Sequence, residues 1–154
     1  MTNKSQKYID LGYIDVDDDV FFEYNYEAAN CFGYALDTWF MTGGKKHPNE
    51  ENIILWFPKT FENEEWRNYI TPDGKYIEET CLDAEKAQEH AEKWRNGEQH
   101  RIVFASVEDT TINPNKPVYK FLGLFKIVDV DDVTGVTLKR IATRVKTYPS
   151  QQDV

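Results

Sequence analysis

Apolar positions in two parts of the chain follow the three- and four-residue spacing of a helix. Residues 25–44, NYEAANCFGYALDTWFMTGG, carry one broad apolar face, with Asn25 as a suitable N-cap and a glycine pair that ends the pattern. Residues 82–97 show a thinner stripe of alanines that ends at Trp94. We therefore expect two helices, the second lying on the surface and contacting the core mainly through Trp94.

Other segments have the composition of strands. Residues 52–58, NIILWFP, form a short continuous apolar run that predicts a buried strand. Residues 66–79, WRNYITPDGKYIEE, predict a hairpin, because Pro72 presets a turn and Asp73-Gly74 supplies the positive backbone angles that return the chain.

Three further strands are expected at the end of the chain, over residues 101–107, 117–130 and 136–148. Gly123 interrupts the second and predicts a bend there. The third also fits a helix by its spacing, but its valine and threonine content favours a strand with a bulge near Lys139-Arg140. Helices followed by consecutive strands indicate an α+β fold with two or three helices and a strongly bent or barrel-like antiparallel sheet.

Composition is that of one folded domain spanning residues 1–154. Of these residues 40% are hydrophobic and 29% charged, and no apolar run has the length of a signal peptide or a membrane span. Two cysteines are too few for a disulfide framework. We expect a cytoplasmic protein without a membrane segment, a cofactor or a structural metal. The run from Asp15 lacks the glycine and glutamate of a calcium loop, having Val20 and Tyr26 in their places.

Charge is unevenly distributed. The net charge is −9, which disfavours loose binding to polyanions. The first 100 residues hold 21 acidic and 10 basic side chains, whereas residues 101–154 hold 6 and 8. Within residues 137–148 there are four basic side chains and no acid: Lys139, Arg140, Arg144 and Lys146. This strip is the main electrostatic indication of a binding surface.

Four segments of the second half together carry a resemblance to a known family. They are EWRNYITPDGKYIEE, RIVFASVED, VYKFLGLFKIVDVDD and LKRIATRVKTY, all within residues 64–148. Together they resemble the small PUA-like β-barrel modules found beside restriction-type nuclease domains. The resemblance implies a binding module that reads a flipped or modified base in a hollow of its sheet, with modified or single-stranded nucleic acid as the partner. No segment resembles the nuclease, so binding rather than catalysis is expected.

A flipped base needs aromatic faces on which to stack, and basic side chains to hold the flanking phosphates. The candidate stacking residues are Trp66, Tyr69 and Tyr119, and the candidate phosphate contacts are Lys120, Arg140, Arg144 and Lys146. Phe121 and Phe125 are further rings, for which a place in the core is the better interpretation.

Two alternatives remain open. NCFGYA, residues 30–35, is similar to the start of the nucleophile helix in NlpC/P60 and transglutaminase-like folds. This similarity implies a papain-like cysteine hydrolase with Cys31 as nucleophile, His100 as base and Asp109 or Asn113 to orient the base. A buried structural cysteine is the simpler interpretation. The other alternative is an acidic protein-interaction module of phage or mobile-element origin, with a protein partner.

His90, near Glu89 and Glu92, is best explained by charge pairing along its helix.

Overall fold

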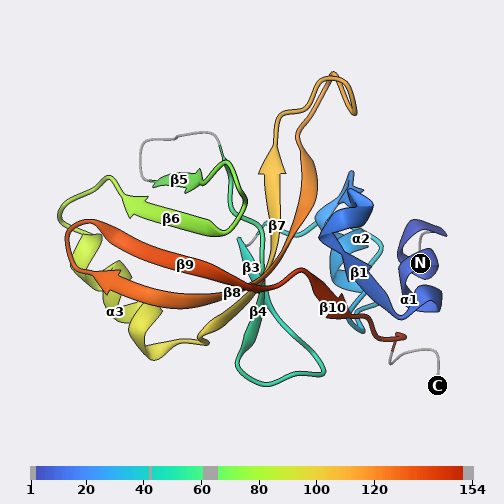
Figure 1. The fold of residues 1–154 in the computed structure, drawn as a ribbon, viewed down its shortest axis with the longest axis horizontal. Helices are drawn as coiled ribbons and strands as arrows, with labels where there is room; N and C mark the ends of the chain where they lie inside the picture. Colours follow the sequence, from blue (N-terminus) through green and yellow to red (C-terminus); the bar gives the residue numbers. More distant parts are fainter. Residues whose placement is uncertain (1–2, 42, 61–65, 151–154) are drawn as a thin grey trace.

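The computed structural model describes residues 3–41, 43–60 and 66–150 as an α+β fold built on a large curved sheet (Figure 1). The helices are α1 (Asn3–Leu11), η1 (Val16–Asp18, a 3-10 helix), α2 (Asn25–Asn30) and α3 (Ala87–Asn96). The strands are β1 (Tyr13–Asp15), β2 (Phe21–Phe22), β3 (Gly44–Lys46), β4 (Ile53–Trp56), β5 (Trp66–Ile70), β6 (Tyr76–Cys81), β7 (His100–Val107), β8 (Val118–Asp131), β9 (Gly135–Ala142) and β10 (Arg144–Lys146). No helix in these residues is both long and apolar enough to span a membrane.

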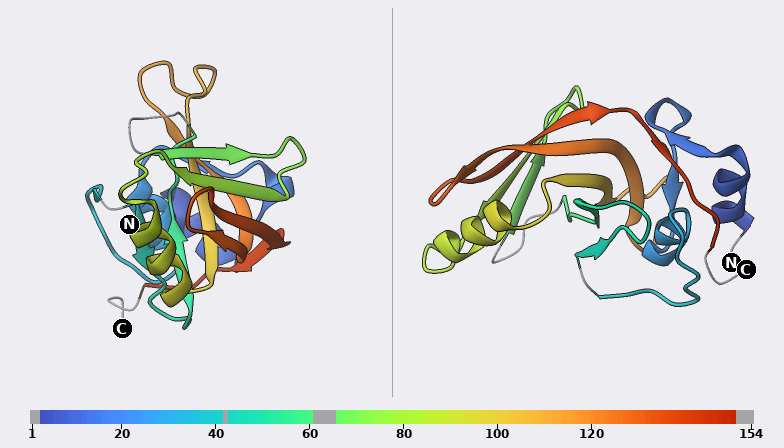
Figure 2. Two further views of the ribbon diagram at one scale, coloured as in Figure 1. Left: turned by 90° about the vertical axis from the view of Figure 1, so that its left-hand side faces the viewer. Right: turned by 90° about the horizontal axis from the view of Figure 1, so that it is seen from below.

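The main sheet has eight strands. Seven lie in the order β3-β4-β7-β8-β9-β6-β5, and β2 pairs with β8 off this path. Pairing is antiparallel except between β4 and β7, which are parallel. The long strands β8 and β9 bend into an arch, seen from below in Figure 2. The predicted α+β class and strongly bent sheet are confirmed, but the sheet stays open rather than closing into a barrel, and one of its pairs is parallel.

Gly123 lies where β8 bends, as the sequence predicts. Its φ is +115°, and a Cβ there would lie 2.6 Å from the carbonyl oxygen of Ala142 on β9. The pairing with β7 shifts register between Val103 and Phe104 at this point. A residue with a side chain would therefore meet both backbone strain and a clash.

The predicted hairpin and C-terminal strands are confirmed. β5 and β6 pair antiparallel across the turn at Pro72–Gly74. The single strand predicted over residues 136–148 is divided in two, because β9 ends at Ala142 and β10 pairs with β1 in a separate two-stranded sheet. The partner of Leu124 is Ala142 while that of Phe125 is Arg140, so the bulged residue is Ile141, next to the predicted position.

The prediction of one helix over residues 25–44 is wrong, because among the residues described in this range only those of α2 are helical. The Asn30 amide bonds to the backbone of Leu36, and the Asn25 amide bonds to the backbone of Phe40. These side chains satisfy the backbone of a loop instead of a helix. Leu36 and Phe40 still pack on the core from that loop, which is why their spacing resembled a helix face. The second predicted helix is confirmed as α3, with Trp94 buried; α1 was not predicted.

The core consists of two clusters of buried side chains. One surrounds Phe22, Phe32 and Phe104, and the other joins Trp94 of α3 to the sheet beside Phe125. Phe121 belongs to the first cluster and Phe125 to the second. Both rings are therefore core, as expected, and neither is available for stacking on a ligand.

Candidate functional site

A hollow of about 330 Å³ lies against the β5–β6 hairpin. The residues that line it come from the hairpin and from two earlier parts of the chain: Met41, Gly43, Trp56, Phe57, Pro58, Lys59, Trp66, Asn68 and Glu79. This volume is in the range of small-ligand sites and is sufficient for a single base. We call it the Trp66 hollow.

Strand register explains why three of these side chains meet. Asn68 on β5 is the direct partner of Glu79 on β6, and Trp66 lies two residues from Asn68 on the same face of its strand. Arg67, between them, and Tyr69, after Asn68, are exposed on the other face. The hairpin therefore presents an aromatic ring, an amide and a carboxyl group to one hollow.

The Asn68 amide has a buried acceptor with no partner. Its Nδ2 donates to the carbonyl oxygen of Lys59 at 3.1 Å, which fixes the orientation of the amide because only the NH₂ end can face a carbonyl. The Oδ1 atom is then buried and bonds to no group in the described part of the chain. Leaving such an acceptor unsatisfied costs about 1–3 kcal/mol. A ligand donor in the hollow would remove that cost.

Glu79 is held from behind by helix α3. The side chain is 9% exposed, and its Oε1 lies 2.9 Å from Nε2 of His90. The His90 ring also packs on the Trp66 ring, with 4.3 Å between centroids. The expectation that His90 pairs with charges along its own helix is therefore wrong, because its charged partner is Glu79 of β6, and its other contacts are the rings of Trp66 on β5 and Trp94 on α3.

A second hollow of about 360 Å³ adjoins the first, with Lys59 lining both. Its aromatic residues include Tyr119, Tyr24 and Trp39, of which Trp39 is the most exposed at 58%. Tyr119 stands edge-on to Phe57, with 5.8 Å between ring centroids, and burial raises the pKa of its phenol. Trp66 and Tyr119, both predicted as stacking residues, thus line neighbouring hollows, whereas Tyr69 lies on the opposite face of β5.

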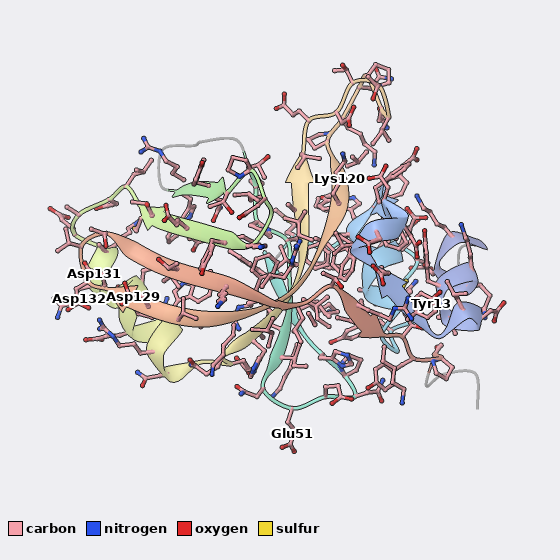
Figure 3. The ribbon with its side chains drawn as sticks, viewed as in Figure 1. Tyr13, Glu51, Lys120, Asp129, Asp131 and Asp132 are labelled. Atoms are coloured by element: carbon pink, nitrogen blue, oxygen red, sulfur yellow. The ribbon has the colours of Figure 1, made fainter. Side chains whose placement is uncertain are left out.

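The predicted phosphate contacts are dispersed. Lys120 pairs with Asp109 at 3.4 Å, near the β7–β8 loop (Figure 3). Arg144 pairs with Asp15 at 2.9 Å and lies over the ring of Tyr13.

Two of these basic residues line a different hollow. Arg144 and Lys146 border a space of about 210 Å³ beside His47 and Tyr148, and neither lines the Trp66 hollow. The guanidinium group of Arg140 lies near Gly74 in the hairpin turn. The structure therefore does not gather the basic strip at the hollow that holds Trp66.

The residues of the hydrolase alternative have separate partners. Cys31 is fully buried, its thiol contacts the carbonyl oxygen of Glu27, and burial raises its pKa far above the ordinary range. His100 contacts the side chain of Asn52, and Asp109 bonds to Thr111 and Lys120. A thiol kept protonated in this way is a poor nucleophile, so the site lacks the activation that the alternative requires.

Asn68, Glu79 and His90 were not predicted as site residues. Strand alternation within the predicted hairpin groups Asn68 with Trp66, and that signal was available. Nothing local indicates which face of the hairpin borders a hollow, since the other lining residues are Met41, Gly43 and residues 56–59, and α3 supports Glu79 from behind.

Comparison with known proteins gives two findings. The model of the SET and RING associated (SRA) domain family matches residues 7–147. The solved structure of the 5-hydroxymethylcytosine-specific restriction enzyme AbaSI is similar over 96% of this chain, with a TM-score of 0.89 and 37% sequence identity. This chain spans 46% of that enzyme's chain. No curated protein matches.

These findings confirm the resemblance to PUA-like modules associated with restriction enzymes. They fit a module that reads a modified base, and not the hydrolase or the acidic interaction module.

Proposed function

The chain belongs to the SRA domain family, and we propose that it binds duplex DNA and reads a modified cytosine, flipped into the Trp66 hollow. The observation that carries the proposal is the unpaired Oδ1 of Asn68, directly across the hairpin from Glu79. The similarity to a 5-hydroxymethylcytosine-specific enzyme supports 5-hydroxymethylcytosine as the base. The proposal concerns recognition only.

The two acceptors match the donors of this base. The 4-amino group of cytosine donates to carboxylates such as Glu79. The hydroxyl of a 5-hydroxymethyl group stands on the next ring carbon and can donate to Oδ1 of Asn68. Directly opposed residues in an antiparallel pair have their Cβ atoms about 4.5–5.5 Å apart, a suitable spacing for two donors on adjacent carbons.

Stacking would come from Trp66. A base removed from the duplex loses its neighbours, and an aromatic side chain replaces them at about 1–3 kcal/mol per base. The ring of Trp66 is supported by His90, so it is already positioned for a ligand.

Overall charge favours selectivity over general affinity. A protein of net charge −9 gains little from unspecific contact with phosphates, so base recognition has to supply much of the binding free energy. A reader of modified DNA has to act in the compartment that holds the DNA, and the cytoplasmic location remains an expectation from the sequence.

The test is fluorescence anisotropy with three labelled duplexes that differ only at one central base: cytosine, 5-methylcytosine or 5-hydroxymethylcytosine. We expect the last to bind most tightly. Trp66→Ala should weaken that binding by about 5- to 150-fold, which corresponds to the loss of about 1–3 kcal/mol of stacking free energy. Tyr69→Ala, on the opposite face of the same strand, is the control and should bind like the wild type. Equal affinity of the wild type for all three duplexes would refute the proposal.

A further inference from the structure

We infer that His90 makes the Trp66 hollow select a 4-amino pyrimidine over a 4-oxo pyrimidine, by keeping Glu79 a hydrogen-bond acceptor toward the ligand. The inference rests on the proposed function, since it concerns the same hollow. His90 itself is a positioning residue, because it acts through Glu79 and is not among the residues that line the hollow.

One atom of His90 serves two neighbours. Nε2 lies 2.9 Å from Oε1 of Glu79 and 2.8 Å from the indole nitrogen of Trp94. The indole N–H can only donate, while Nε2 carries either a hydrogen or a lone pair. Which of these two contacts is a hydrogen bond to or from Nε2 therefore depends on whether Nε2 carries a hydrogen.

Nε2 either carries a hydrogen or does not, and in both cases Glu79 presents an acceptor oxygen to the ligand. If Nε2 carries the hydrogen, it donates to Oε1, and Glu79 is a carboxylate with two acceptor oxygens. If Nε2 instead accepts from the indole N–H of Trp94, its single lone pair is already engaged, and an O–H on Oε1 could only share that lone pair with the indole. In each case Oε2, which forms no hydrogen bond within the described residues, can only accept.

Charged neighbours do not change this conclusion. Arg101 on β7 lies over the Trp94 ring at 4.6 Å from its centroid, and Glu89 on the solvent side of α3 pairs with Lys93. Burial lowers the pKa of Arg101, and the charges of Glu98 and Glu79 act in the opposite direction, so Arg101 attracts Glu79 and provides no acceptor that would compete for its place.

An acceptor in this place distinguishes the two kinds of pyrimidine. The 4-amino group of a cytosine donates to Oε2, whereas the 4-oxo group of a uracil or thymine places a second acceptor against it. An unmatched pair of buried acceptors lowers affinity by about 5- to 150-fold. Without His90, Oε1 would lose this contact, and the carboxyl group of Glu79 could turn so that it no longer presents an acceptor to the 4-position of the base.

The experiment compares two duplexes, with 5-hydroxymethylcytosine or 5-hydroxymethyluracil at one position opposite guanine. For the wild type and each variant, anisotropy gives the ratio of the affinity for the hydroxymethylcytosine duplex to that for the hydroxymethyluracil duplex. The two duplexes differ in the free energy of base flipping, but this difference is the same for every variant and cancels when the ratios are compared. We expect His90→Leu to reduce the wild-type ratio by about tenfold. His90→Gln, whose amide can still donate to Oε1, should keep it within about twofold, and so should Lys93→Ala on the exposed side of α3.

Trp94→Phe provides a second, independent variant. It removes the indole donor, so Nε2 is left to donate to Glu79, and the ratio should be retained. A His90→Leu protein that folds and keeps the wild-type ratio would overturn the inference, as would a His90→Gln protein that loses it. A wild type that prefers neither base while binding the hydroxymethylcytosine duplex tightly also overturns it, and leaves the proposed function standing. A wild type that does not recognise that duplex refutes the proposed function instead.

Discussion

Asn68 and Glu79 are direct partners in the register of β5 and β6, and both point to the Trp66 hollow. One offers a buried oxygen without a partner, and the other a carboxyl group fixed by His90. Unpaired buried acceptors are rare in folded proteins, and one placed beside a second acceptor in a hollow indicates a binding site rather than a packing error. The same arrangement predicts that a substitution at Asn68 can keep or raise the stability of the protein while it weakens binding.

Replacing Asn68 with leucine is expected to weaken recognition of the modified base without unfolding the protein. The change removes a buried acceptor that costs about 1–3 kcal/mol, and loses the bond to Lys59, worth about 0.5–1.5 kcal/mol. The free energy of unfolding, measured by urea denaturation, should therefore stay within about 1 kcal/mol of the wild type or rise. Affinity for a 5-hydroxymethylcytosine duplex should fall by about tenfold or more.

Tyr69→Leu, one position along β5 and exposed, is the control for that substitution. A strong loss of stability in Asn68→Leu, with binding unchanged in the molecules that remain folded, would contradict the role given to Oδ1.

The basic side chains of β9 and β10 remain proposed phosphate contacts. If Arg140 and Lys146 hold phosphates, Arg140→Ala and Lys146→Ala should weaken binding equally for modified and unmodified duplexes and reduce the salt slope by about one each. Arg144→Ala should have a smaller effect, because its guanidinium group already pairs with Asp15. The measurement is affinity at several salt concentrations, and unchanged slopes in both variants would remove these residues from the interface.

Signals from residues close together in the sequence were sufficient to predict much of the fold. The turn residues at Pro72–Gly74, the β-branched and aromatic composition of residues 101–148 and the bend at Gly123 each act through neighbouring residues, and each prediction was confirmed. The helix predicted over residues 25–44 failed because Asn25 and Asn30 bond to backbone 6 to 15 residues away, which apolar spacing does not reveal.

The site was less predictable than the fold. Trp66 was found because an aromatic residue in a PUA-like module is a natural stacking candidate. Asn68, Glu79 and His90 acquire their roles only when β5, β6 and α3 come together, and in sequence His90 shows only the local pairing pattern of a surface helix. The basic strip is prominent in sequence because strand neighbours are close along the chain, yet the fold gives its members separate partners.

Gly123→Ala is expected to destabilise the protein strongly. Alanine at φ +115° is strained by about 1–3 kcal/mol, and its Cβ would also approach the Ala142 carbonyl oxygen to 2.6 Å. We expect the free energy of unfolding to fall by at least about 2 kcal/mol in urea denaturation. Gly43→Ala, where a Cβ meets nothing within 4 Å and φ is not positive, should change it by well under 1 kcal/mol. Equal stability of the two variants would show that β8 does not need its bend at this residue.

Cys31 should behave as a buried structural thiol. Burial raises its pKa in the folded protein, so the folded state holds the proton more tightly than the unfolded chain, where a cysteine titrates near about 8.5. The resulting stability is fully present below that pH and is lost as pH rises above it. Replacing Cys31 with alanine should therefore flatten the decline in the free energy of unfolding between about pH 8 and 10, measured at each pH in urea.

Alkylation by iodoacetamide tests the same property directly. Peptide-resolved mass spectrometry separates Cys31 from Cys81, and we expect Cys31 to react slowly in the folded protein and at the rate of an ordinary thiol in urea. Cys31→Ala should bind the modified duplex like the wild type, because the residue is not among those that line the Trp66 hollow. Rapid alkylation at neutral pH that slows in His100→Ala would instead revive the hydrolase, since it requires a thiolate that the buried position of Cys31 disfavours.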